Sequence, residues 1–203
     1  RGLCPDRLPG RLSAVQRRAL LLALGTAWFA TLRAAEDAAW AALRSGSAVL
    51  LMRHAATEPG IGDPPGFRIE DCATQRNLSA AGREQAQRFG RELAARGVRF
   101  DAVYSSRWCR CRDTARLAFP GLPVQALPAL DSFFDERERG PAQTAELRAW
   151  LARLPADRNV SLVTHMVNIT ALVGGSIAMG EAVVLQRRRG AWESAGRLAF
   201  SPA

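Results

Sequence analysis

Two runs of mainly apolar residues stand out in the pattern of hydrophobic and polar positions, and each leads into a histidine. Residues 49–52 are all apolar and precede Arg53 and His54, while residues 160–164 precede His165. Runs without strict alternation are typical of strands buried on both faces, as in a parallel sheet. Ligands of such sheets bind beyond the carboxyl ends of the strands. The pattern therefore predicts a site at the two histidines, which are the only histidines of the chain.

The rest of the pattern alternates helices with strands. We expect further strands over 101–105 and 124–127, a final antiparallel pair from 181–186 and 197–200, and helices over 36–43, 79–97, 106–119, 141–154 and 167–173. Ser79 has the side chain of a helix N-cap. This alternation predicts an α/β fold with a mainly parallel sheet.

Two irregular stretches interrupt the alternation. Residues 58–77 are rich in proline and glycine, and residues 130–137 are irregular and carry acids. Long loops beside strand ends are usually functional or disordered. We interpret residues 58–77 and 131–139 as walls that decide substrate specificity.

The N-terminus has a composition of its own. Arg17 and Arg18 precede the apolar residues 19–32, which are too short to span a bilayer comfortably. This arrangement is typical of a secretory signal, so we assign 1–35 to a signal peptide or apolar leader and 36–203 to a single domain. A buried or membrane-anchoring helix is the alternative. We expect a periplasmic or secreted protein with no stable membrane span once the leader is removed.

Charge does not indicate a nucleic-acid partner, although the formal net charge is +9 and all 28 basic residues are arginines. Six of these arginines lie within residues 1–35, and most of the others are interleaved with acids along the predicted helices. Such interleaving is typical of solvated helix faces. We interpret Arg187, Arg188 and Arg189 as the solvated end of a strand beside Gly190.

Three cysteines follow the leader: Cys72, Cys109 and Cys111. In an oxidising compartment two of them can pair. On a helix Cys109 and Cys111 point to different faces, so we do not expect them to bond each other. The pairing that we favour is Cys72–Cys109. No histidine lies at a metal-ligand spacing from these cysteines, and we expect no metal site.

The residues that follow the predicted strands suit phosphate chemistry. An unprotonated, well-positioned histidine can attack phosphorus, and guanidinium groups bind the phosphoryl oxygens in pairs. Arg53 adjoins His54, and Arg107, Arg110 and Arg112 come just after the strand at 101–105. The sequence thus predicts a phosphate pocket that needs no cofactor.

Four stretches, in this order, resemble the histidine phosphatase superfamily, also called phosphoglycerate mutase-like. They are Arg53-His54-Ala55-Ala56-Thr57, residues 77–86, Val103–Ser106 with residues 110–115, and residues 162–165. The resemblance implies a three-layer α/β/α fold. Residues 62–64, 71–79 and 108–110 further resemble an exported bacterial branch that includes a lipopolysaccharide core heptose phosphate phosphatase.

The resemblance also implies roles. His54 would be the phosphorylated nucleophile, Arg53, Arg110 and His165 would complete the phosphate pocket, and Thr57 would lie near the phosphate. Cys111 is expected in the core.

The general acid is left open between three residues. Members of the superfamily carry it either directly after the second histidine, where this chain has Met166, or in the loop before the helix at 141–154. That loop offers Asp131, Asp135 and Glu136, and spacing slightly favours Asp131.

These inferences lead to one principal hypothesis, a metal-independent phosphomonoester hydrolase of the histidine acid phosphatase type. It would act in the cell envelope, through a phosphohistidine at His54, on a small phosphorylated substrate such as a sugar phosphate. The alternatives are a phosphotransferase of the phosphoglycerate mutase type and a non-catalytic module that binds phosphorylated sugars.

Overall fold

The structure is a computed structural model that describes residues 33–199, so nearly all of the predicted leader lies outside the described residues. The described residues from Ala35 onward form one compact unit. Its six strands make a single sheet in the order β3-β2-β4-β1-β5-β6. The bounds are β1 Ala48–Arg53, β2 Ala102–Ser105, β3 Val124–Ala126, β4 Val160–Thr164, β5 Ala182–Arg188 and β6 Ala191–Leu198.

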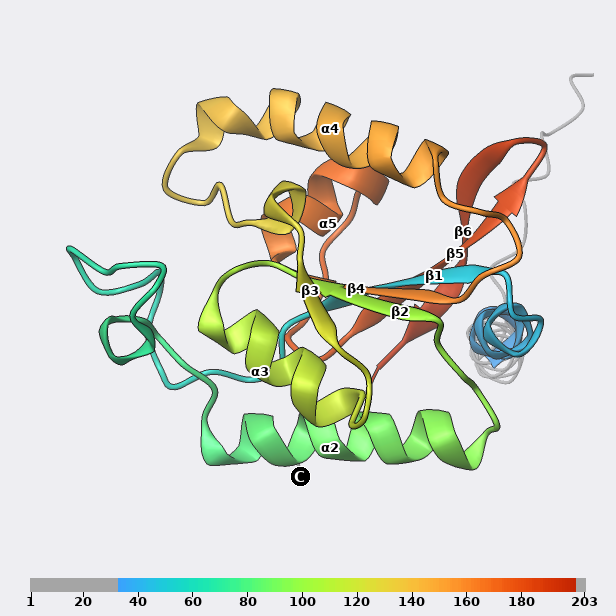
Figure 1. Cartoon of the computed structure of the whole chain (residues 1–203), viewed down its shortest axis with the longest axis horizontal. Helices are drawn as coiled ribbons and strands as arrows, with labels where there is room; N and C mark the ends of the chain where they lie inside the picture. Colours follow the sequence, from blue (N-terminus) through green and yellow to red (C-terminus); the bar gives the residue numbers. More distant parts are fainter. Residues whose placement is uncertain (1–32, 200–203) are drawn as a thin grey trace, which may run out of the picture. The chain divides into compact units, whose positions relative to one another are not determined.

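Helices cover both faces of this sheet. The helices α2 and α3 lie on one face, and α4 and α5 lie on the other (Figure 1). Their bounds are α2 Ala80–Ala95, α3 Cys109–Ala118, α4 Gly140–Ala152 and α5 Met166–Val173. Strands β3, β2, β4 and β1 run parallel, and β5 and β6 are antiparallel to their neighbours. The predicted α/β/α fold with a mainly parallel sheet is therefore confirmed.

Strand β1 shows why its sequence lacks alternation. Leu50 belongs to the core on the α2 and α3 side with Phe89 of α2. Leu51 belongs to the core on the other side with Leu147 of α4 and Ile169 of α5. Because both faces of the strand are covered by helices, apolar side chains are needed at consecutive positions.

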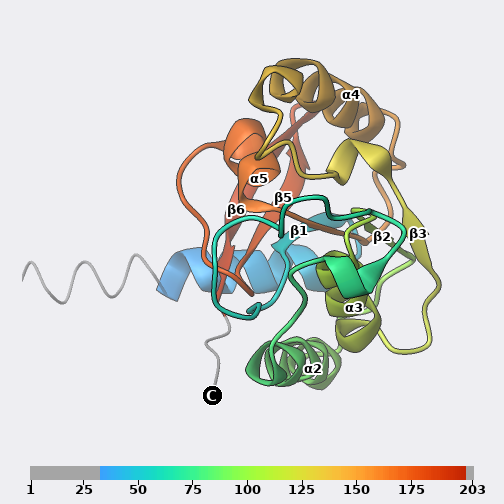
Figure 2. The ribbon, with the colours of Figure 1, turned by 90° about the vertical axis from the view of Figure 1, so that its left-hand side faces the viewer.

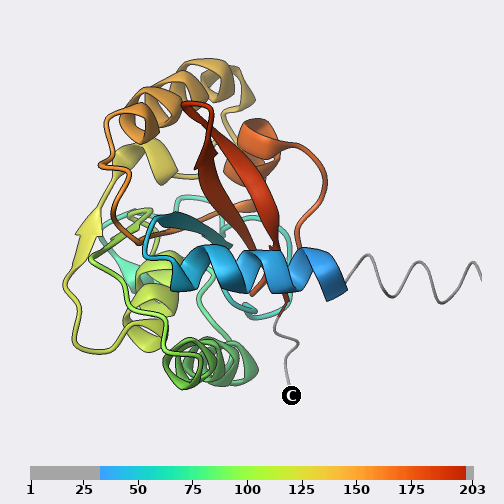
Figure 3. The same ribbon diagram turned by 90° about the vertical axis from the view of Figure 1, so that its right-hand side faces the viewer.

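Three elements differ in extent from the sequence prediction. Helix α3 begins at Cys109 rather than at residue 106, because the backbone N–H of Ser106 still bonds to the Val163 carbonyl of β4 and that of Arg107 bonds to Asp131. The final pair is longer than expected and forms a hairpin whose turn contains Gly190. The first helix, residues 33–44, packs against β6 where Gly196 meets the Ala35 carbonyl (Figure 3).

The long loop after β1 crosses the edge of the sheet at which the parallel strands end (Figure 2). It returns to the body of the protein at α2, which is capped by the Ser79 hydroxyl as predicted. Gly82 in the first turn of α2 is required there, since a Cβ would lie 1.8 Å from the Ala56 carbonyl oxygen. Between residues 33 and 199, no helix combines the length and apolar character needed to cross a membrane.

Candidate active site

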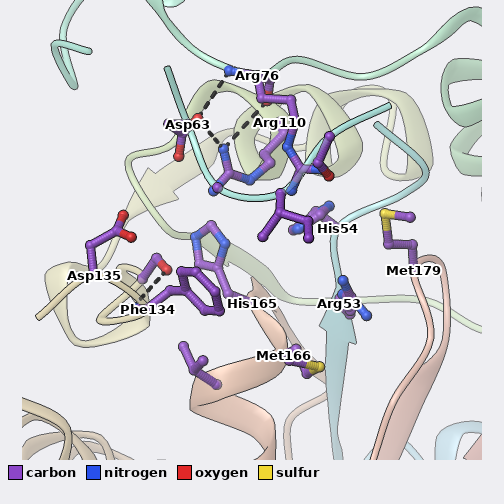
Figure 4. A pocket seen from close by; sticks show the side chains of 15 residues that line it. Arg53, His54, Asp63, Arg76, Arg110, Phe134, Asp135, His165, Met166 and Met179 are labelled. Carbon is purple, nitrogen blue, oxygen red and sulfur yellow. Dashed lines mark hydrogen bonds and ion pairs between the residues drawn. The ribbon is translucent and has the colours of Figure 1, made fainter. Parts of the chain in front are cut away.

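The two histidines meet at the carboxyl ends of β1 and β4. Arg53 and Thr164 are partners in the parallel pairing, so His54 and His165 leave the sheet side by side. Their ring centroids are 5.4 Å apart, and the residues are 3% and 4% exposed. Both line one cavity of about 230 Å³ (Figure 4). The convergence that the two strand ends predicted is present in the fold.

The ring of His54 is neutral and held in one tautomer. Its Nδ1 lies 2.9 Å from the Ala55 carbonyl oxygen, which can only accept a hydrogen bond, so Nδ1 carries the proton. Nε2 then has a free lone pair. Burial, followed by the charge of Arg110, lowers the pKa of His54 to about 3. The imidazole is therefore unprotonated over the whole physiological pH range.

His165 is held by a chain of side chains. Its Nε2 lies 2.9 Å from the Ser106 hydroxyl, and this hydroxyl lies 3.2 Å from Oδ1 of Asp131. Burial and the Arg110 charge keep the pKa of His165 well below its usual value. The Cys111 sulfur lies 3.4 Å from the same Nε2, and burial raises the pKa of this thiol to about 12. Cys111 is thus a buried thiol, as expected for a core position.

Three arginines surround the histidines: Arg53, Arg76 and Arg110. Each has one guanidinium nitrogen bound to the protein: Arg53 donates to the Ile177 carbonyl at 2.7 Å, Arg76 to the Gly60 carbonyl, and Arg110 to Asp63 at 2.7 Å. Their Nε atoms are buried and have no hydrogen-bond partner among the described residues. Buried donors without partners are rare and call for an acceptor.

Asp63 holds Arg110 in place. Its buried carboxylate also accepts hydrogen bonds from the indole Nε1 of Trp108 and the backbone N–H of Arg76, both at 2.9 Å. Burial raises the pKa of Asp63 more than any single contact lowers it. The hydrogen bond and charge of Arg110, together with the hydrogen bonds from Arg76 and Trp108, outweigh burial and keep the pKa below its usual value. Asp63 is therefore ionised and is a poor proton donor.

Sequence reasoning missed both Asp63 and Arg76. Arg76 directly precedes the stretch at 77–86 that resembles the superfamily, and this adjacency could have drawn attention to it. Asp63 lies within residues 62–64, which resemble the exported branch, but that stretch does not indicate a role for it, because its contacts depend on how the proline-rich and glycine-rich loop folds.

A disulfide between Cys72 and Cys109 joins this loop to the start of α3, with Cα atoms 5.6 Å apart. The predicted pairing is confirmed. The Gln75 side chain adds a second link by accepting a hydrogen bond from the Cys109 N–H at 2.9 Å. The disulfide thereby ties the loop that carries Asp63 and Arg76 to the helix that carries Arg110.

The residues proposed as general acid occupy different environments. The carboxylate of Asp131 accepts hydrogen bonds from the backbone N–H and the guanidinium of Arg107, at 2.8 and 2.7 Å, and does not line the cavity. Glu136 pairs with Arg139 at 3.0 Å. Asp135 lines the cavity, is exposed, and has no ion pair or hydrogen bond to another described side chain.

Two further expectations concern Thr57 and metals. The Thr57 hydroxyl donates to the Met179 sulfur at 3.7 Å, and Thr57 does not line the cavity. Within residues 33–199, no cluster of three or more histidines, cysteines, aspartates or glutamates is placed to hold a metal ion.

Comparison with known proteins decides the family. Residues 49–159 match the model of the histidine phosphatase superfamily (branch 1), which is more than half of the chain. The chain belongs to this superfamily. The matched residues include His54, Arg76 and Arg110 of this chain and end before His165. A search of curated proteins gave no match.

Solved structures of several phosphatases share the fold. The alpha-ribazole phosphatase of Shigella flexneri has 20% identity and a TM-score of 0.55, with 77% of this chain and 97% of that chain covered. The phosphoserine phosphatase of Entamoeba histolytica, in complex with 3-phosphoglyceric acid, has 14% identity, a TM-score of 0.58, and coverages of 75% and 96%. The mycobacterial glucosyl-3-phosphoglycerate phosphatase has 19% identity, a TM-score of 0.54, and coverages of 73% and 96%.

Proposed function

We propose that this member of the histidine phosphatase superfamily is a phosphomonoester hydrolase that works through a phosphohistidine at His54 and needs no metal. One observation carries the proposal. A neutral imidazole with a free Nε2 lies beside three guanidinium groups whose buried Nε atoms have no partner in the part of the chain that the structure describes. A phosphoryl group supplies both an electrophile for the imidazole and acceptors for the arginines.

In the first step, Nε2 of His54 attacks phosphorus, and a P–N bond forms as the P–O bond to the alcohol breaks. Arg53, Arg76 and Arg110 bind the phosphoryl oxygens, on which charge is spread throughout the transition state. Nδ1 keeps its proton and donates to the Ala55 carbonyl, which stabilises the positive charge that develops on the ring.

The departing alkoxide needs a proton, and we assign its donor to Asp135. Of the two carboxylates that line the cavity, Asp63 is committed to Arg110, whereas Asp135 is free to reach the alcohol oxygen. In the second step the Asp135 carboxylate takes a proton from water, which attacks phosphorus, breaks the P–N bond and releases inorganic phosphate. One carboxyl group thus acts first as acid and then as base.

His165 completes the pocket and is positioned by Ser106 and Asp131. The Ser106 hydroxyl donates its one proton to Asp131, so its oxygen accepts a hydrogen bond from the Nε2–H of the neutral His165 ring. Nδ1 of His165 then has a free lone pair, which can accept a hydrogen bond from a protonated phosphoryl oxygen. In this scheme Asp131 is a positioning residue that acts through Ser106. Thr57 has no direct part, because its hydroxyl is bound to Met179.

The test is a rapid-quench reaction of the purified protein with a radiolabelled phosphomonoester. We expect a phosphoenzyme that is labile in acid and stable in alkali, turnover that is unaffected by a chelator, and release of all the phosphate as inorganic phosphate. His54→Ala should lower kcat by on the order of 10⁴-fold or more, because it removes the nucleophile. Its thermal unfolding serves as the control for folding.

The same experiment separates the alternatives. A mutase-type phosphotransferase would transfer the phosphoryl group to an added alcohol such as a phosphoglycerate instead of releasing it. A binding module would bind the ester without turnover and would keep its affinity in His54→Ala. Loss of activity with the chelator would contradict the mechanism.

We further propose that the protein is exported and acts on a sugar phosphate of the cell envelope. The disulfide supports an oxidising compartment, and residues 19–32 support a secretory signal. Fractionation of cells followed by N-terminal sequencing of the mature protein tests export. A heptose phosphate should be tested as a substrate of the purified protein, because the resemblance to the exported branch suggests it.

A further inference from the structure

The mouth of the cavity is apolar and exposed. Only three large hydrophobic residues are exposed in the part of the chain that the structure describes, Ile61 at 90%, Met166 at 37% and Val173 at 36%. Two of them, Ile61 and Met166, line this cavity together with Phe134. Figure 4 shows Phe134 and Met166 on the side of His165 away from Arg76 and Arg110. Exposed apolar side chains gathered at one cavity indicate a binding surface.

The charges of the cavity leave room for one anion. We call Arg53, Arg76, Arg110, Asp63 and the two histidines the floor of the cavity. The three arginines are positive, Asp63 is negative and both histidines are neutral, so the floor carries a net charge of two positive. A phosphate monoester carries up to two negative charges near neutral pH and balances it.

Among residues 33–199, no further arginine lines the cavity, and the charged residue at its mouth is Asp135. The guanidinium of Arg137 is stacked over the Phe134 ring at 5.3 Å and does not line the cavity. A second anion on the substrate would therefore lie beside an apolar surface and a carboxylate.

We propose that the mouth selects phosphomonoesters whose alcohol part is an uncharged ring with an apolar face, either an alicyclic or aromatic ring or the C–H face of a sugar. Substrates with a second anionic group are rejected. This inference rests on the proposed function, because it concerns the leaving group at the same site. Ile61, Phe134 and Met166 cover the ring, and Asp135 reaches the ester oxygen between ring and phosphate.

The test compares primary alkyl phosphates, so that leaving-group chemistry stays nearly constant. Ethyl phosphate is the reference, and cyclohexylmethyl phosphate, glucose 6-phosphate and 4-carboxycyclohexylmethyl phosphate are the ring substrates. We expect kcat/KM for at least one neutral ring to exceed that for ethyl phosphate by about tenfold or more, in line with the burial of several carbons. The carboxylate analogue should be about tenfold or more worse than cyclohexylmethyl phosphate, since its charge is left unpaired. Whichever of the two neutral rings has the higher kcat/KM shows whether the mouth binds a hydrocarbon ring or the C–H face of a sugar.

Ile61→Ser is the matched variant, because a side chain that is 90% exposed contributes little to folding. It should lower the preference for the neutral ring over ethyl phosphate by roughly threefold to tenfold, consistent with losing part of one apolar contact. Val173→Ser, at the other exposed apolar residue, should leave the preference unchanged, since Val173 does not line the cavity.

Two results would overturn the inference: equal kcat/KM for the neutral and carboxylate rings, or a ring preference that Ile61→Ser does not reduce. Failure of the proposed function looks different. In that case ethyl phosphate would not be turned over either, and no phosphohistidine would form on His54.

Discussion

The floor and the mouth of the cavity are built in opposite ways. On the floor, His54 and His165 are buried and each has a ring nitrogen fixed by a hydrogen bond, and Arg110 is paired with a buried carboxylate. At the mouth, Ile61 and Asp135 are exposed. Groups that stabilise a transition state must be preorganised, whereas a surface that accepts an alcohol can adapt. Under the proposed function, the floor binds and attacks the phosphoryl group, whereas the mouth accepts the alcohol and protonates it through Asp135.

The largest effect that sharpens this contrast concerns Asp135, the mouth residue that we assign to proton transfer. Asp135→Asn should lower kcat for an alkyl phosphate by roughly 10²–10⁴-fold, the usual contribution of a general acid. The loss should be much smaller for p-nitrophenyl phosphate, whose leaving group needs no proton. Glu136→Gln is the control, because Glu136 pairs with Arg139 outside the cavity. If Asp131→Asn showed this leaving-group dependence instead, Asp131 would be the acid.

A second effect tests whether the floor depends on the disulfide. Reduction of Cys72–Cys109, which are 37 residues apart, should lower the free energy of unfolding by roughly 3–4 kcal/mol from loop entropy. KM should rise as well, because the loop that carries Arg76 and Asp63 is then held to α3 by hydrogen bonds and the ion pair of Asp63 with Arg110 alone. Urea unfolding and steady-state kinetics with and without a thiol reductant measure both. The double variant Cys72→Ser with Cys109→Ser should not respond to the reductant. An equal response in this variant would show that the reductant does not act through the disulfide.

A third effect follows from the buried histidines. The pKa of His54 falls to about 3 in the folded state and that of His165 falls well below its usual value, whereas both return to about 6.5 on unfolding. Below pH 6.5 the two histidines bind protons in the unfolded chain but not in the folded chain. The free energy of unfolding therefore falls as the pH decreases from about 6.5 towards 4. The slope should reach roughly 1.4 kcal/mol per pH unit for each histidine.

Urea unfolding at several pH values measures this slope, and His54→Gln should reduce it by about half, since one of two histidines is removed. An unchanged slope in the variant would show that His54 is protonated in the folded protein.

The smallest effect separates the two histidines within the floor. His54 is fixed by a backbone carbonyl, but His165 is fixed by the Ser106 side chain. Ser106→Ala should lower kcat by about tenfold, comparable to the loss of one hydrogen bond, and should shift the pH profile. Ser105→Ala is the matched control, because its hydroxyl bonds to the Ser106 carbonyl and not to a histidine. Equal losses in the two variants would indicate a purely structural role for Ser106.

Much of the fold could be predicted because its signals are local. The unbroken apolar run of β1 reflects burial on both faces, and Ser79 marks the start of α2 with its own side chain. The start of α3 could not be predicted in this way. Arg107 and Ser106 bond to Asp131, which lies 24 and 25 residues further along the chain, and no local propensity reports such a contact.

The same division holds for the site. By itself, the sequence determined that two histidines follow two buried parallel strands and must therefore share one edge of the sheet. Only the tertiary structure decided which polar groups meet them there. Asp63 reaches Arg110 across 47 residues, and Asp135 rather than Asp131 lines the cavity. The burial of a strand is visible in its consecutive residues. Ion pairs between loops depend instead on where the rest of the fold places those loops.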